Sequence, residues 1–201
     1  PTNFSHYQLY PRALSRVQVT SKIVSAEREG FDAAMAGMCI IDSFSQEGRQ
    51  AVKMPVVGGM ESAMLLAQLI GKKIVCITVA PVFVQPIEAM IRLHGWEHRV
   101  LSYQPVRTLD ISSWPSIVDA ANGRPDRWVE MFDQAAQQAV RDGADVVICG
   151  CNPGGALLHM SGYREVVGTG VPVITGPSAM VKMAEMMVDL QRSIGLAKSE
   201  A

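Results

Sequence analysis

The chain has 201 residues, 48% hydrophobic and 18% charged, and its 18 basic and 19 acidic residues leave a net charge of −1. This length suits one large domain or two lobes of about 100 residues each, and either can bury a core. A near-neutral chain without a Lys/Arg block argues against nucleic-acid binding. With no apolar run of ~18 residues and no opening signal peptide, a membrane or secreted protein is not expected.

The four cysteines are spaced neither as a disulfide scaffold nor as a zinc site. They are Cys39, Cys76, Cys149 and Cys151, and no pair has the C-x2-C spacing of a metal site. We therefore expect reduced thiols, no bound metal and a cytoplasmic location.

Hydrophobic spacing and glycine stops predict alternating helices and strands. In chain order the first half reads helix 12–29, strand 32–37, helix 44–52, strand 54–57, helix 61–70 and strand 73–79. The second half reads helix 82–94, strand 99–103, a long connection over 104–125, helix 126–142, strand 145–150, a glycine-rich stretch, strand 171–175 and helix 178–194. Because most strands are apolar throughout, we predict an α/β fold with parallel sheets covered by helices on both faces.

Two stretches of the chain resemble each other twice, in the same order. Residues 27–39 and 140–152 both read as a helix end, Gly, Asp, a strand, Gly and then a cysteine, and residues 55–64 and 172–180 share a Pro-Val…Gly…Ser-Ala-Met pattern. This repeat predicts two similar three-layer lobes with parallel four-stranded sheets, related by a pseudo-twofold axis.

The repeat also predicts where the lobes begin and end. We expect residues 1–72 and 178–201 to form the first lobe, residues 73–177 the second, and a ligand cleft to lie between them, at the carboxyl ends of the strands. The first lobe starts at the helix equivalent to 126–142, so we expect it to lack an N-terminal strand–helix–strand.

The cysteine of each repeat stands at a turn where a strand ends. Backbone amides of such a turn form an anion-binding nest and lower the pKa of a thiol from its usual value of about 8.5. Two facing thiols, Cys39 and Cys151, can invert a carbon centre: one thiolate removes a proton while the opposite thiol returns one. This chemistry needs neither a metal nor an organic cofactor. Cys76 and Cys149, within strands, are expected to serve packing.

The gapless alignment of the repeat leaves one alternative open. In it Met38, not Cys39, is the counterpart of Cys151, and only a one-residue bulge restores Cys39 to that place. A methionine cannot act as a base.

Further residues are expected to bind substrate around the thiols. Ser43 can donate a hydrogen bond to a carboxylate, and amides of Gly58 and Gly59 can bind an anion ahead of a helix. After Cys151, the run Asn152, Pro153 and Gly154 lets the backbone approach a ligand closely.

With these residues in view, the chain resembles the aspartate/glutamate racemase superfamily, in particular its hydantoin/allantoin racemase branch. The resemblance runs over nearly the whole chain. It is carried by Glu29-Gly-Phe-Asp-Ala33, Cys39-Ile-Ile-Asp42-Ser43, Pro55-Val-Val-Gly-Gly-Met-Glu-Ser62, Ile77-Thr78-Val79, Gly143-Ala-Asp-Val-Val-Ile-Cys-Gly-Cys151 and Gly170-Val-Pro-Val-Ile-Thr-Gly176.

The resemblance implies a cofactor-independent enzyme with one catalytic cysteine from each of two similar lobes. These cysteines map onto Cys151 and onto Cys39, or the slot of Met38, and Thr78 maps onto a substrate-binding threonine. We expect a homo-oligomeric racemase or epimerase of a small carboxylate or cyclic amide, such as a substituted hydantoin. Two alternatives stay open. One is one-cysteine chemistry on the same scaffold, decarboxylation or maleate-type cis–trans isomerisation, and the other is a non-catalytic small-anion-binding protein.

Overall fold

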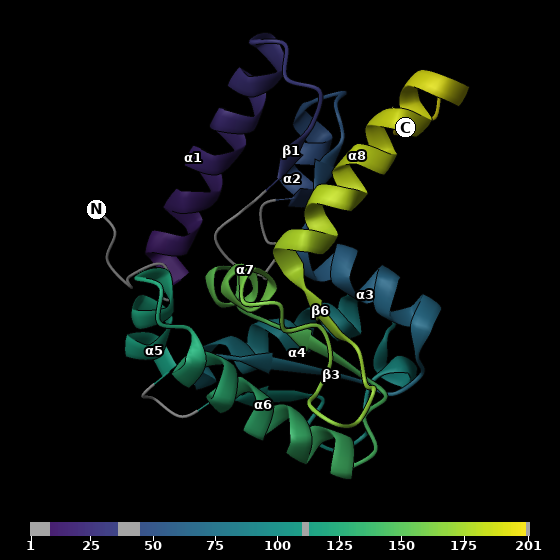
Figure 1. Ribbon diagram of the computed structural model, residues 1–201. Helices are drawn as coiled ribbons and strands as arrows, with labels where there is room; N and C mark the ends of the chain where they lie inside the picture. The colour runs from purple at the N-terminus through teal and green to yellow at the C-terminus, as the bar shows by residue number, and fades with distance from the viewer. Residues whose placement is uncertain (1–8, 36–44, 110–112, 200–201) are drawn as a thin grey trace. The chain divides into compact units, whose positions relative to one another are not determined.

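The computed structural model describes residues 9–35, 45–109 and 113–199 of the chain (Figure 1). They form two compact units. Unit 1 comprises the described parts of Pro1–Ala36, Asp42–Gly58 and Met180–Ala201, and unit 2 comprises those of Gly59–Ala179. The predicted division differs mainly in the segment 59–72, whose helix α3 (Gly59–Ile70) contacts strand β5 and so belongs to unit 2. The pseudo-twofold relation between two lobes stays a prediction.

Unit 2 is built on a four-stranded sheet in which every strand runs parallel to its neighbours. The strand order is β4-β3-β5-β6. The central pair places Ile77 opposite Cys149, and at the next ladder Cys149 stands opposite Thr175. The strands are β3 (Ile74–Thr78), β4 (Val106–Thr108), β5 (Val146–Cys149) and β6 (Val173–Thr175). This arrangement confirms the predicted α/β class.

Helices cover the sheet because both faces of its central strands are apolar. Alternation along β3 and β5 sends Val75, Ile77, Val147 and Cys149 to one face, where they pack in a cluster with Trp128 and other apolar side chains of three helices. These helices are α5 (Ser113–Ala121), α6 (Asp126–Arg141) and α7 (Asn152–Met160). In Figure 1 the green α6 runs alongside the sheet. Two other helices also contact the sheet: α3 contacts β5, and α4 (Val84–Leu93) contacts β4.

The segment between α4 and α6 departs from the prediction. The expected strand over 99–103 is wrong: Glu97–Arg99 is a 3-10 turn, and Val100 makes only an isolated bridge to Ile74. The strand beside β3 is β4, which pairs Val106 with Cys76 after a turn in which Gln104 has a φ of 47°. The expected long connection over 104–125 therefore contains both a strand and the helix α5.

The remaining helices of the chain follow the predicted spacing. A 3-10 turn at Pro81–Phe83 leads into α4, and the predicted helices 126–142 and 178–194 correspond to α6 and to α8 (Gly176–Ile194). No helix among the described residues is both long and apolar enough to span a membrane.

The described part of unit 1 holds a two-stranded parallel sheet, fewer strands than the sheet of unit 2. Its strands β1 (Ala34–Met35) and β2 (Val56–Val57) pair Ala34 with Val56. Helix α1 (Leu9–Arg28) contacts α2 (Ser45–Ala51), and Ile23 of α1 packs in a cluster with Val52 and Val56. The expectation that the first lobe lacks strands present in the second stays a prediction.

Candidate active site

The carboxyl end of β5 carries the sequence Cys149-Gly150-Cys151, and its middle residue brings the chain close to β3. The Gly150 N–H donates to the Ile77 carbonyl at 2.7 Å. A Cβ at Gly150 would lie 2.7 Å from the Cys76 Sγ and 3.2 Å from the Ile77 carbonyl oxygen, so only glycine fits this approach. Cys76 is buried within β3, as expected of a packing cysteine.

Cys151 is the N-cap residue of α7. Its backbone is extended, with φ −129° and ψ 112°, and its Sγ accepts a hydrogen bond from the Gly154 N–H at 3.4 Å. Its carbonyl accepts from the Gly155 N–H at 2.7 Å, which is the first hydrogen bond of the helix. The thiol therefore lies at the positive end of the helix, where a negative charge is stabilised.

The glycine-rich stretch after Cys151 is the first turn of α7. Asn152 and Gly154 are buried and Pro153 is exposed. A proline fits the first helical turn because it has no N–H to lose there. The amides that the sequence predicted around this thiol therefore belong to a helix N-terminus, and one of them, that of Gly154, donates to the sulfur.

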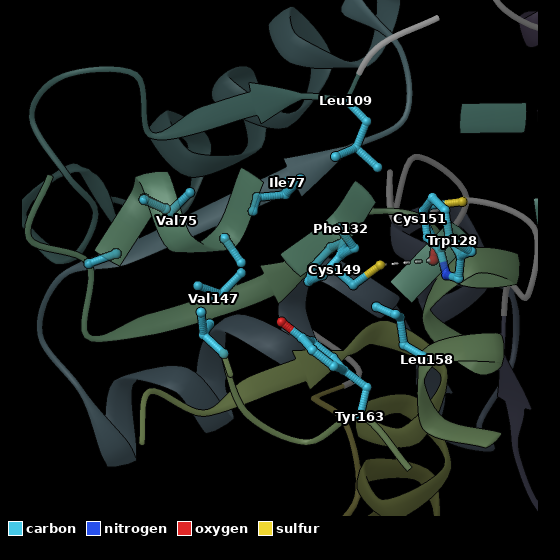
Figure 2. Packing of buried hydrophobic residues seen from close by; sticks show 14 of the residues in the cluster. Val75, Ile77, Leu109, Trp128, Phe132, Val147, Cys149, Cys151, Leu158 and Tyr163 are labelled. Atoms are coloured by element: carbon cyan, nitrogen blue, oxygen red, sulfur yellow. Dashed lines mark hydrogen bonds between the residues drawn. The ribbon is translucent and has the colours of Figure 1, made fainter. Parts of the chain in front are cut away.

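Cys149 points the other way and stays neutral. Complete burial raises the pKa of its thiol well above 9.0, and the nearby Cys151 adds to this shift. Its S–H donates to the Cys151 carbonyl with a sulfur–oxygen distance of 3.6 Å. In Figure 2 a dashed line marks this contact, and the Cys151 sulfur points away from the Cys149 sulfur. Of these two cysteines, Cys151 is the candidate for chemistry.

Trp128 of α6 contacts the same helix turn from the core side. It is fully buried, and its indole Nε1–H donates to the Gly154 carbonyl at 3.0 Å. A Cβ at Gly154 would lie 2.4 Å from the Trp128 Cζ2, so the indole rests directly on the glycine. Sequence reasoning missed this residue, because nothing in helix 126–142 signals a contact 26 residues further along the chain.

The other predicted site residues have different surroundings. Thr78 ends β3, is fully buried, and donates its hydroxyl to the Gly150 carbonyl at 3.4 Å. Gly58 is buried and is the last residue of the middle segment of unit 1, and Gly59 begins α3 in unit 2. The remaining three, Met38, Cys39 and Ser43, lie outside the described residues.

The described residues therefore bring together one half of the predicted site: Cys151, the α7 turn and the end of β3. Within the described ranges, no group of three or more His, Cys, Asp or Glu side chains is placed to hold a metal ion. A thiol at the carboxyl edge of a parallel sheet that accepts a hydrogen bond from a helix amide suits an enzyme using cysteine as a base or nucleophile.

Comparison with known proteins identifies the family. The profile of the Asp/Glu/Hydantoin racemase family matches residues 7–184. The chain belongs to this family and is an isomerase of the racemase class.

Two relatives by sequence and one solved structure agree with the assignment to the racemase family. The hydantoin racemase of Pseudomonas sp. (strain NS671) is 31% identical over 202 residues, which cover 99% of this chain and 74% of the relative. The hydantoin racemase of Rhizobium meliloti is 30% identical over 177 residues, 88% of this chain and 68% of the relative. The allantoin racemase from Klebsiella pneumoniae has the same fold, with a TM-score of 0.70 at 22% identity, covering 92% of this chain and 69% of that chain.

Proposed function

We propose that this chain racemises a small amino-acid-derived substrate, either a cyclic amide of the hydantoin type or a related carboxylate, by proton transfer between two cysteines. The family assignment supports racemisation, and the names of the two curated relatives support a hydantoin as substrate. The carrying observation is the hydrogen bond from the Gly154 N–H to the Cys151 sulfur at the N-terminus of α7.

The proposed reaction moves one proton off the substrate carbon and one proton onto it. The Cys151 thiolate takes the proton from the carbon between ring carbonyl and nitrogen, and the C–H bonding electrons move into the carbonyl to form an enolate. The thiol of Cys39 then gives its proton to the opposite face of the same carbon, which inverts the centre. Cys151 ends as a thiol and Cys39 as a thiolate, ready to act on the other enantiomer. This sequence of steps uses no cofactor.

The surroundings of Cys151 suit the thiolate that this reaction needs. A hydrogen bond and a helix N-terminus favour the charged form of the group they face. The neighbouring Cys149 remains a neutral thiol and adds no negative charge beside it. The observed donor to the Cys151 sulfur is the backbone amide of Gly154, and a backbone donor fixed in a helix turn needs little reorganisation during the reaction.

Deuterium exchange at the reacting carbon tests the proposal. Each pure enantiomer of a 5-alkyl hydantoin is incubated in D2O with wild type, Cys151→Ser or Cys39→Ser and followed by proton NMR, with an enzyme-free sample for spontaneous exchange. We expect wild type to exchange and invert both enantiomers. Neither variant should racemise, because a serine hydroxyl is a far weaker base than a thiolate at neutral pH.

The two variants should then differ in which enantiomer they exchange, because each retains a thiol on one face only. If Cys151→Ser racemises at the wild-type rate, the proposal is wrong. If Cys39→Ser alone keeps full activity, the two-cysteine mechanism is wrong, and the alignment that gives Met38 the place opposite Cys151 becomes the better one. Exchange of the proton without inversion of the carbon centre in wild type would likewise contradict the two-cysteine mechanism.

A further inference from the structure

The peptide between Gly154 and Gly155 is held at both of its polar ends. Its carbonyl accepts from the Trp128 indole at 3.0 Å, and its N–H donates to the Cys151 carbonyl at 2.7 Å. The indole bond joins the first turn of α7 to α6, while the second bond lies within α7 itself. Without the indole bond the turn loses this contact with α6, and a typical intramolecular hydrogen bond contributes about 0.5–1.5 kcal/mol.

The orientation of this turn decides where the Gly154 N–H points. Glycine has no Cβ to restrict its torsions, so the direction of its N–H depends on what holds the residue from outside. Here the indole ring of Trp128 fills the space that a Cβ on Gly154 would need, because its Cζ2 lies 2.4 Å from the ideal Cβ position. The indole N–H also donates to the Gly154 carbonyl. The Gly154 N–H then donates to the Cys151 sulfur at 3.4 Å.

We propose that Trp128 is a positioning residue for the Cys151 thiolate, acting through Gly154 without touching the substrate. Its indole holds the backbone amide that stabilises the reacting sulfur. The expected effect of Trp128 on catalysis rests on the proposed function of Cys151 as a base. Its expected effect on the stability of the Cys151 thiolate does not depend on that function. A purely structural role for Trp128 as a filler of the core predicts a different result in the experiment below.

The experiment measures how fast Cys151 of the full chain reacts with iodoacetamide between pH 6 and 10, by mass spectrometry of the peptide that contains it. The thiolate is the reacting form, so the midpoint of the pH–rate profile reports how well the charge is stabilised. In Trp128→Phe the donor is lost and the N–H of Gly154 is freer to turn. We expect the midpoint to move to higher pH and the rate at pH 7 to fall about threefold to tenfold, the range of one lost hydrogen bond.

Two controls separate positioning from packing. Phe132→Leu removes ring volume from the same buried cluster, where Phe132 lies 6.1 Å from Trp128 between ring centroids, but it removes no hydrogen bond. Trp96→Phe makes the same chemical change at another buried tryptophan, which stacks on His94. In both control variants the free energy of unfolding should fall or stay the same, while the midpoint of the pH–rate profile of Cys151 should not move.

A second variant keeps the test valid if Trp128→Phe fails to fold. Replacement of Trp128 by β-(3-benzothienyl)alanine keeps the ring shape and exchanges the N–H for sulfur, so only the hydrogen bond is lost. The proposal is overturned if the midpoint stays at the wild-type pH in this variant, or if Phe132→Leu moves it equally. A racemisation assay adds that kcat should fall while KM stays the same. Because alkylation needs no turnover, it answers the question even if the racemase proposal fails.

Discussion

Replacing Gly154 by alanine places a methyl group into the contact between α7 and α6. The new Cβ would lie 2.4 Å from the Trp128 Cζ2 and 3.0 Å from its Cη2. An ordinary carbon contact needs about 1 Å more than the shorter of these distances, so either the indole or the helix turn must move by that amount. The indole is fully buried in the core cluster, and we therefore expect the turn to move.

Two opposing effects set the size of the change. Overpacking a buried site costs typically 1–3 kcal/mol, while alanine gains up to about 1 kcal/mol over glycine in a helix. We expect a net loss of about 1–2 kcal/mol in the free energy of unfolding. The effect on activity should be larger, because a 1 Å misplacement of a reacting group can lower the rate by about 100-fold.

The assay combines urea unfolding, alkylation of Cys151 and racemisation for Gly154→Ala, Trp128→Phe and the double variant. Phenylalanine lacks the outer indole ring, so the double variant should lose less stability than the sum of the single losses. Gly155→Ala is the matched control, because its Cβ would meet Thr175 at a milder 3.1 Å. Wild-type stability and activity in Gly154→Ala, or strictly additive losses, would refute the reasoning.

Three further predictions concern β5 and its ends. Burial raises the pKa of the Cys149 thiol above its unfolded value of 9.0, so the stability that the neutral thiol contributes is present below pH 9 and is lost as pH rises. The free energy of unfolding that Cys149→Ala loses relative to wild type should therefore shrink by about 1.4 kcal/mol between pH 7 and 10. A loss that is the same at both pH values, as expected of Val147→Ala, would contradict this. Asp145→Ala removes three hydrogen bonds of 2.7–3.0 Å from two amides ahead of β3 and should lower the free energy of urea unfolding by about 2 kcal/mol, so a loss near zero would be inconsistent with a role for these bonds. In a brief iodoacetamide treatment near neutral pH, Cys151 should label faster than the mid-strand Cys76, and equal slow labelling of both would argue against an activated site.

Much of the fold could be predicted from hydrophobic spacing and glycine stops. Helix 126–142 corresponds to α6, and strands 73–79 and 145–150 contain β3 and β5, because both the periodicity and the stop are local properties of the chain. The parallel α/β class followed from the alternation of these elements, and it is confirmed.

The edge of the sheet could not be predicted, because strand pairing is decided between distant segments. The run Arg99-Val-Leu-Ser-Tyr103 has a strand-like composition, but only Val100 bridges to β3. The left-handed turn at Gln104 then carries the chain to β4, where Val106 pairs with Cys76. Local composition measures how well a segment suits a sheet and not which partner it finds.

In the candidate site, too, some features could be predicted from the sequence and others depend on tertiary contacts. The sequence by itself determined that Cys151 follows a buried strand and precedes a stretch whose amides can face a thiol, since the apolar run and the Gly and Pro residues around Cys151 are local features of the chain. Only the tertiary structure decided that the stretch is a helix turn, that Cys149 points its thiol at the Cys151 carbonyl, and that Trp128 of α6 holds Gly154. The Cys149 contact spans only two residues, whereas the Trp128 contact joins α6 to α7. Buried carbonyls are usually paired with a donor, and which side chain supplies it is decided when the elements pack together.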